Sequence, residues 1–225
     1  MKMMSFALLG AALCASATAA AHVSLSSGAA VAGSSSELTF SVGHGCHRTS
    51  GGEADTSKVV FDIPAGVTEV KPMPAYPFSA VVTSTTVTFQ KDEPKVDDTS
   101  FYKFTIRARV PNAPFTKVYF PAHQFCEKAA DSEPGEWTVT PSSDAGSGNA
   151  PAVTVMPSRQ PGWNKYTVPV AVTDMSIFKD AQIVWKGNAA YSENAVTKEQ
   201  IKAEAGSGVT ELTAIAANDE IWVKY

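Results

Sequence analysis

Apolar and polar residues alternate along short segments of this chain. The clearest segment is 101–110, where Phe104 and Ile106 alternate with Lys103 and Thr105. An alternation with a period of two buries one face of a β-strand and leaves the other face in water. Similar β-rich segments recur between glycine, proline, serine and aspartate residues, at 38–42, 58–63, 67–71, 79–90, 117–125, 137–140 and 152–156. Short strands separated by turn residues predict an all-β sandwich or barrel.

The pattern changes after residues 142–151, a glycine- and serine-rich segment that is typical of a loop or linker. Beyond it we expect one helix over 196–205, capped by Thr197, and strands over 163–172, 181–185 and 221–225. The sequence therefore predicts a β-sandwich domain over residues 22–157 and a small α+β extension over residues 158–225. Packing of the extension is assigned to three tryptophans, Trp163, Trp185 and Trp222.

The first 21 residues have the three parts of a secretory signal peptide. Lys2 is followed by an apolar run and then by small residues that end at Ala21. The run is too short to span a bilayer, and no later segment is apolar enough to do so. We therefore expect removal of residues 1–21, no membrane span, and a periplasmic or secreted mature chain that begins at His22.

The composition of the chain excludes several classes of function. The 225 residues carry a net charge of −4, which becomes −5 without Lys2, and 44% of them are hydrophobic against 18% charged. Such a chain is neither disordered nor basic enough to bind nucleic acid. The sequence also lacks a nucleophile elbow, a phosphate-binding glycine loop and a clustered basic patch. We expect no enzymatic activity and neither nucleic acid nor a membrane as partner.

Removal of the signal peptide reduces the cysteines from three to two. It takes away Cys14, whose preceding bulky Leu13 disfavours a lipoprotein anchor, and leaves Cys46 and Cys126. An even pair in an oxidising compartment predicts a disulfide, which at this loop length stabilises the fold by roughly 4 kcal/mol. A two-cysteine metal site is the alternative, although it would normally show CxxC spacing.

Cleavage before His22 would give the mature chain a histidine with a free α-amine. The amine and the imidazole Nδ1 of that residue can hold one Cu(II), which prefers nitrogen ligands in a tetragonal plane. Cleavage after Ala19 would instead leave the histidine in third position, which is another copper-chelating terminus. Because the amine must lose its proton, we expect copper binding to weaken as the pH falls below the usual pKa of an α-amine.

The other three histidines flank the two cysteines in the sequence. His44 and His47 lie on either side of Cys46, and His123 lies three residues before Cys126. A disulfide would bring the three imidazoles into one neighbourhood, and imidazole is a common metal ligand. Each histidine alone is a weak indication, since a lone histidine is more often a polar loop residue.

Several short segments form a pattern when they are taken together. They are Ala21-His22-Val23-Ser24-Leu25, Gly33, Leu38-Thr39-Phe40-Ser41-Val42, Ile63-Pro64-Ala65-Gly66-Val67, Val70-Lys71-Pro72-Met73-Pro74, Tyr119-Phe120-Pro121, Gln124 and Glu136-Trp137. Over about residues 22–157, this pattern resembles the YcnI-like family of secreted copper-binding proteins. The segment Gly43-His44-Gly45-Cys46 and the ending of the chain at 219–225 resemble a cysteine-containing proteobacterial branch of that family.

The resemblance implies an immunoglobulin-like sandwich that holds Cu(II) through the N-terminal His22, with Trp137 close to the metal. Better-known members of the family complete the site with a glutamate about two dozen residues after the histidine. In this chain that point falls near Gly45, where no carboxylate is present. Four side chains are candidates for its place: His44 and His47, which we favour, His123 and Glu53.

Three functions are compatible with these features. The first, which we favour, is a periplasmic protein that holds Cu(II) in copper homeostasis or trafficking, without catalysis and with other copper-handling proteins as partners. The second is a histidine-brace copper monooxygenase, in which His123 and Phe125 would complete an open copper face. The third is a cell-surface interaction module in which the histidines have no metal role.

Overall fold

The computed structural model describes residues 23–94, 97–126, 131–137 and 148–225. The expected signal peptide of residues 1–21 and the expected copper ligand His22 lie outside the described residues. Within the described ranges, no helix is long and apolar enough to cross a membrane.

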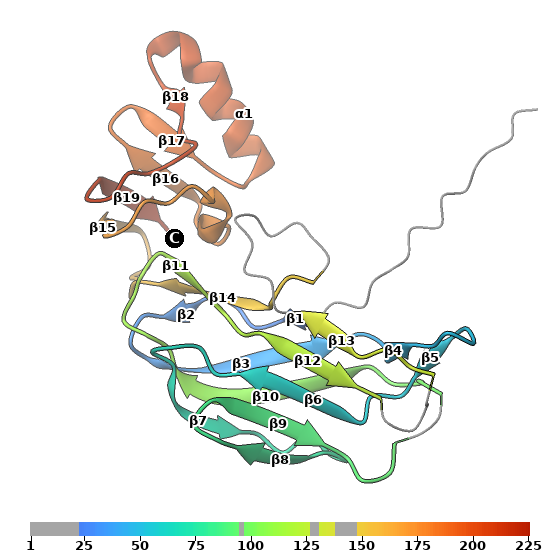
Figure 1. The fold of residues 1–225 in the computed structure, drawn as a ribbon. Helices are drawn as coiled ribbons and strands as arrows, with labels where there is room; N and C mark the ends of the chain where they lie inside the picture. The colour runs from blue at the N-terminus through green and yellow to red at the C-terminus, as the bar shows by residue number, and fades with distance from the viewer. Residues whose placement is uncertain (1–22, 95–96, 127–130, 138–147) are drawn as a thin grey trace, which may run out of the picture.

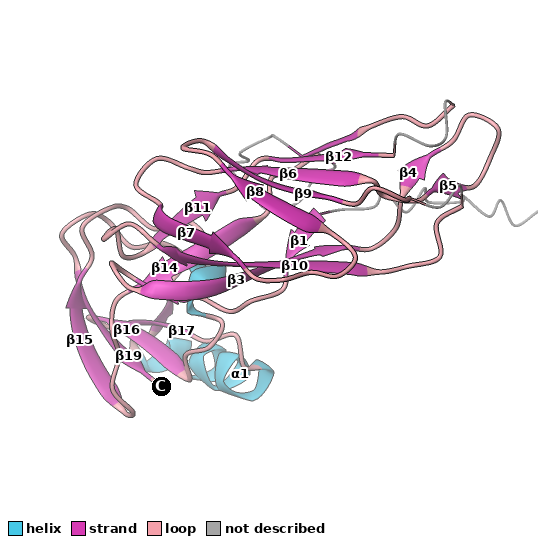
Figure 2. Ribbon diagram, turned by 90° about the horizontal axis from the view of Figure 1, so that it is seen from below, coloured by secondary structure: helices cyan, strands magenta, loops and turns pink. Residues whose placement is uncertain are grey.

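Two antiparallel sheets face each other and form a sandwich (Figures 1 and 2). The first sheet has the order β1 (Val23–Leu25), β3 (Ser35–Val42), β10 (Tyr102–Arg109), β7 (Thr68–Pro72). The second has the order β13 (Gly135–Trp137), β12 (Ala122–Phe125), β6 (Lys58–Asp62), β9 (Thr86–Gln90), β8 (Ser79–Val82). Since β7 and β8 contact each other, the edge strands β1 and β13 share the opposite side of the sandwich.

Alternation along the strands builds the core between the two sheets. In β10, Phe104 and Ile106 are fully buried, whereas Lys103 is exposed. The rings of Phe40 and Phe61, one from each sheet, stack with their centroids 4.2 Å apart. Each fully buried phenylalanine contributes about 1.5–3 kcal/mol. The predicted all-β sandwich is confirmed.

Smaller sheets lie at the two ends of the sandwich (Figure 1). At one end, β2 (Ala30–Val31) runs parallel to β14 (Ala152–Met156), which pairs with β11 (Thr116–Tyr119). At the other end, β4 (Cys46–His47) and β5 (Glu53–Ala54) form a hairpin. The single strand predicted over 117–125 is therefore wrong. It divides into β11 and β12 in different sheets because Pro121, which has no amide hydrogen, interrupts it.

The C-terminal residues form a second, smaller sheet, which confirms the predicted α+β extension. Its strand order is β15 (Trp163–Thr167), β19 (Glu220–Lys224), β16 (Ile183–Lys186), β17 (Ala189–Tyr191), β18 (Thr210–Glu211). The helical elements are η1 (Met175–Phe178), α1 (Ala195–Ala203) and η2 (Glu204–Ser207). The helix begins earlier than predicted because Asn194, not Thr197, is its cap: the Asn194 side chain accepts hydrogen bonds from the amides of Val196 and Thr197.

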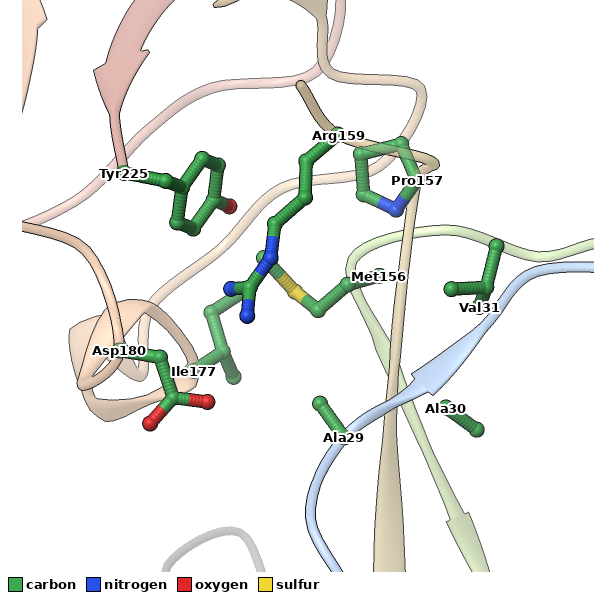
Figure 3. Close-up of a pocket in the computed structure, with 9 residues that line it drawn as sticks. All are labelled: Ala29, Ala30, Val31, Met156, Pro157, Arg159, Ile177, Asp180 and Tyr225. Atoms are coloured by element: carbon green, nitrogen blue, oxygen red, sulfur yellow. The ribbon is translucent and has the colours of Figure 1, made fainter. Parts of the chain in front are cut away.

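The extension packs on the end of the sandwich that carries β11 and β14. Phe115 enters the hydrophobic core of the extension, and Lys117 Nζ lies 2.8 Å from Asp174 Oδ2. Figure 3 shows a small pocket at this junction, lined by Ala29, Ala30, Val31, Met156, Pro157, Arg159, Ile177, Asp180 and Tyr225. The Arg159 guanidinium lies 4.3 Å from the centre of the Tyr225 ring. The pocket is thus made by the two packed units and lies away from the hairpin that carries His47.

Candidate metal centre around His44

His44 lies in the short loop 43–45 between β3 and β4. Glycine is required at position 45, because a Cβ atom there would lie 1.7 Å from the carbonyl oxygen of Ala54. The Gly45 amide also donates a hydrogen bond to Asp98 Oδ2 at 2.7 Å, and Gln124 Nε2 donates one to the His44 carbonyl at 2.9 Å. The backbone of His44 is therefore held from several sides.

The disulfide between Cys46 and Cys126 is confirmed, with the two Cα atoms 6.0 Å apart. It links β4 to the residue that follows β12, across a sequence separation of 80 residues. Gln124, two residues before Cys126, is buried and also donates to Thr56 Oγ1 at 2.6 Å. The covalent link and the Gln124 side chain together fix the His44 loop to the second sheet.

The imidazole of His44 has one nitrogen engaged and one nitrogen unused. Nδ1 lies 2.8 Å from the Gly45 carbonyl oxygen and 3.0 Å from Glu53 Oε1. Both partners accept hydrogen bonds, so Nδ1 carries the hydrogen and Nε2 of the neutral ring holds a lone pair. Nε2 is buried and has no hydrogen-bond partner among the residues that the structure describes.

This arrangement fits a metal ligand. Leaving a buried polar nitrogen unpaired costs about 1–3 kcal/mol. A metal-ligating histidine almost always donates its other ring N–H to a carboxylate or a carbonyl, which orients the ring. His44 meets that requirement through Glu53 and Gly45. Its Nε2 therefore suits copper, for which imidazole is a good ligand.

His47 is placed differently. It is exposed, and the hairpin register sets it opposite Glu53. The residues that follow it are tied down by Arg48, whose guanidinium contacts Asp97 at 3.0 Å and Asp131 at 3.2 Å. Hydrogen bonds from Ser50 and Arg48 hold the pKa of Asp131 below its usual range. The hairpin is thus anchored on one side by ion pairs, while the His47 side chain faces solvent.

His123 lies on the outer face of the second sheet. Its neighbour Gln124 is buried, and successive side chains of a strand point to opposite faces. The His123 Nδ1 contacts the Glu136 carboxylate, and its Nε2 lies 3.6 Å from Asp62 Oδ2. Both ring nitrogens therefore face acidic oxygens. The structure brings His44 together with Glu53 but turns His123 toward another face.

The strand that carries Trp137 and the first described strand share one edge of the sandwich. Trp137 is the last residue of β13, where its backbone is opposite Ala122. Val23 begins β1 opposite Val42, the last residue of β3. The first described residues therefore lie beside the strand that leads into the His44 loop.

The sandwich domain matches a known protein family. A family model described as "Domain of unknown function (DUF1775)" matches residues 22–86 and 78–157. The chain belongs to the DUF1775 family. This is the domain of the YcnI-like proteins, so the resemblance seen in the sequence is confirmed at the level of the family.

No curated protein matches this DUF1775 chain. Among solved structures, it is similar to one from Nocardia farcinica, titled "Crystal structure of an uncharacterized protein from Nocardia farcinica reveals an immunoglobulin-like fold". The two chains are 23% identical, the TM-score is 0.49, and the match covers 60% of this chain and 98% of the other.

In the described part of this DUF1775 protein, His44 Nε2 is the nitrogen that is placed to bind a metal ion. Within that part, no group of three or more histidine, cysteine, aspartate or glutamate side chains is arranged to hold a metal ion. Sequence reasoning missed Asp98 and the positioning role of Gln124, although Gln124 belongs to the family pattern. A Cu(II) ion at His44 Nε2 would need further ligands from residues that the structure does not describe.

Proposed function

We propose that this DUF1775 protein is a periplasmic or secreted copper-binding protein. It holds Cu(II) through His22, the N-terminal residue of the mature chain, and through His44, and it takes part in copper homeostasis or trafficking without catalysis. The observation that carries the proposal is the His44 imidazole, whose Nδ1 hydrogen is held by acceptors and whose Nε2 is buried and unpaired within the described residues.

Chain connectivity supports His22 as the second ligand residue. Val23 is opposite Val42 in the sheet, and consecutive Cα atoms are about 3.8 Å apart. Val23, which follows His22 in the sequence, is therefore paired with the end of β3, and His44 follows that end by two residues. The α-amine and Nδ1 of His22, together with Nε2 of His44, would supply three nitrogens, which suits the preference of Cu(II) for nitrogen ligands in a plane.

Glu53 has an orienting role in this proposal rather than a place on the metal. Its carboxylate accepts the Nδ1 hydrogen of His44 and so orients the ring. The near-metal role of Trp137 rests on the family resemblance and on the shared edge of β13 and β1. His47 remains a candidate for an additional ligand from the exposed side of the hairpin.

The test combines intact-mass measurement of the secreted protein with Cu(II) titration of that species. We expect a mature chain that begins at His22, one tightly bound Cu(II), and binding that weakens at lower pH as the amine takes up its proton. His44→Ala should lower the affinity at least tenfold and change the nitrogen hyperfine pattern of the Cu(II) spectrum. His123→Ala is the matched control and should leave both unchanged.

Two results would contradict the proposal. A mature terminus at Val23 or later, or the absence of tight Cu(II) binding, would remove the copper function. Unchanged affinity and an unchanged spectrum in His44→Ala would remove His44 from the site.

A further inference from the structure

Three of the four tryptophans in the chain lie together on the outer face of the C-terminal sheet. Trp163 is 50% exposed and Trp222 is 48% exposed, and both line one shallow depression with the half-buried Trp185. The sequence-based assignment of these residues to packing is therefore wrong. Alternation along β19 points Ile221 and Val223 into the core of the extension and leaves Trp222 outside.

The strand register arranges the three indoles in a row. Trp222 is directly opposite Trp185 of β16 and, on its other side, opposite Lys165 of β15. Trp163 is opposite Lys224, two residues farther along β19. With ordinary strand spacing and rise, the backbones of Trp163 and Trp185 are about 12 Å apart across three neighbouring strands. The aromatic row therefore runs across three strands of the sheet, from the edge strand β15 to β16.

Size and charge restrict what this surface can bind. The exposed parts of Trp163 and Trp222 offer on the order of 300 Å², whereas a stable protein interface buries about 800 Å² on each partner. The chain has a net charge of −4, which opposes binding to an anionic membrane surface or to nucleic acid. On the same face, Lys165 and Glu220 neutralise each other at 2.8 Å. A neutral ligand with flat apolar faces fits these conditions best.

We propose that this face binds a neutral, β-linked polysaccharide chain. The pyranose rings of such a chain present C–H groups on their faces, which pack on indole rings, and hydroxyl groups at their edges. The outward side chains of Lys165, Glu220 and Lys224 stand beside the tryptophans, where they can donate to or accept from those hydroxyls. Aromatic residues with a few polar groups at their rim are the usual lining of a small-molecule site. The inference is independent of copper binding.

The experiment is calorimetric titration of the mature protein with cellohexaose and with chitohexaose. We expect saturable binding of at least one of them, a loss of at least tenfold in affinity for Trp222→Ala and for Trp163→Ala, and retention of most of the affinity in Trp222→Phe. Phe101→Ala is the matched control, because Phe101 is an aromatic residue that is 59% exposed on the sandwich. It should bind like the wild type.

The absence of saturable binding to both oligosaccharides would overturn the proposal, as would an equal loss in Phe101→Ala. Binding of the wild type to phosphatidylglycerol vesicles, or a dimer in sedimentation that Trp222→Ala dissociates, would assign the surface to lipid or to a second copy instead. Thermal unfolding of each variant checks the fold. If Trp222→Ala does not fold, the comparison of Trp222→Phe with Trp163→Ala decides.

Discussion

His44 and His123 lie near the same disulfide, and each contacts a glutamate, yet their imidazoles are in different chemical situations. His44 gives its Nδ1 hydrogen to acceptors and keeps Nε2 buried and unpaired within the described part of the chain. His123 has a carboxylate at each ring nitrogen, Glu136 on one side and Asp62 on the other. A carboxylate at one ring nitrogen orients the imidazole and leaves the other nitrogen for a metal. Carboxylates at both ring nitrogens leave neither nitrogen for a metal.

The backbone explains the difference between the two histidines. His123 belongs to a strand, so the parity that buries Gln124 sends His123 to the outer face. His44 belongs to a loop whose path is set by its contacts with Ala54, Asp98 and Gln124. A loop held in this way can direct a side chain inward or outward without following the alternation of a strand. Proximity to a cysteine in the sequence therefore does not predict which histidine can bind a metal.

The largest expected effect follows from removing the disulfide. Cys46→Ala combined with Cys126→Ala should lower the free energy of unfolding by about 4 kcal/mol, because a cross-link over this separation restricts the unfolded chain. Cu(II) affinity should fall as well, since the His44 loop loses its covalent link to β12. Urea unfolding at equilibrium measures the first effect. A loss below about 1 kcal/mol would contradict this account of the cross-link.

The next largest effect is expected from a comparison of the two glycines on either side of His44. Gly45→Ala places a Cβ atom 1.7 Å from the Ala54 carbonyl oxygen, so the loop must move. We expect a loss of about 1–3 kcal/mol in stability and at least a tenfold loss in Cu(II) affinity. Gly43→Ala is the control, because a Cβ there meets no atom of the described residues within 4 Å. Similar behaviour of the two variants would show that loop position does not matter for copper.

Much of the sandwich could be predicted from the sequence, because alternation reports directly on which side chains of a strand are buried. Phe104 and Ile106 of β10 are examples. The even number of cysteines expected after export also predicts the disulfide correctly. Alternation does not say what covers a face, which is why the tryptophans of the extension, Trp222 among them, were assigned to packing. It also does not report register, so the contact of His44 with Glu53 could not be predicted.

The need for glycine at position 45 illustrates the same limit. It depends on a carbonyl oxygen of Ala54, a residue in the next strand of the hairpin. The composition of the loop does not predict that contact, because glycine and histidine are ordinary loop residues. The candidate ligands that the sequence indicates have distinctive chemistry, whereas the residues that position the His44 loop, such as Asp98 and Gln124, contact its backbone.

The prediction with the smallest effect on stability is also the sharpest comparison, because it changes the same residue type beside each histidine. Glu53→Gln removes the charge that orients His44 and should lower Cu(II) affinity about 10- to 100-fold. Glu136→Gln removes the equivalent charge beside His123 and should leave Cu(II) affinity unchanged. Because both glutamates are substantially exposed, either substitution should change stability by less than about 1 kcal/mol.

Cu(II) titration and urea unfolding of the two variants in parallel separate an effect on the metal from an effect on the fold. A lower affinity with unchanged stability in Glu53→Gln alone assigns Glu53 to the orientation of His44. Equal losses of affinity in both variants would place His123 in the metal site, and the distinction between a metal-ready imidazole and a charge-paired one would then fail for this protein.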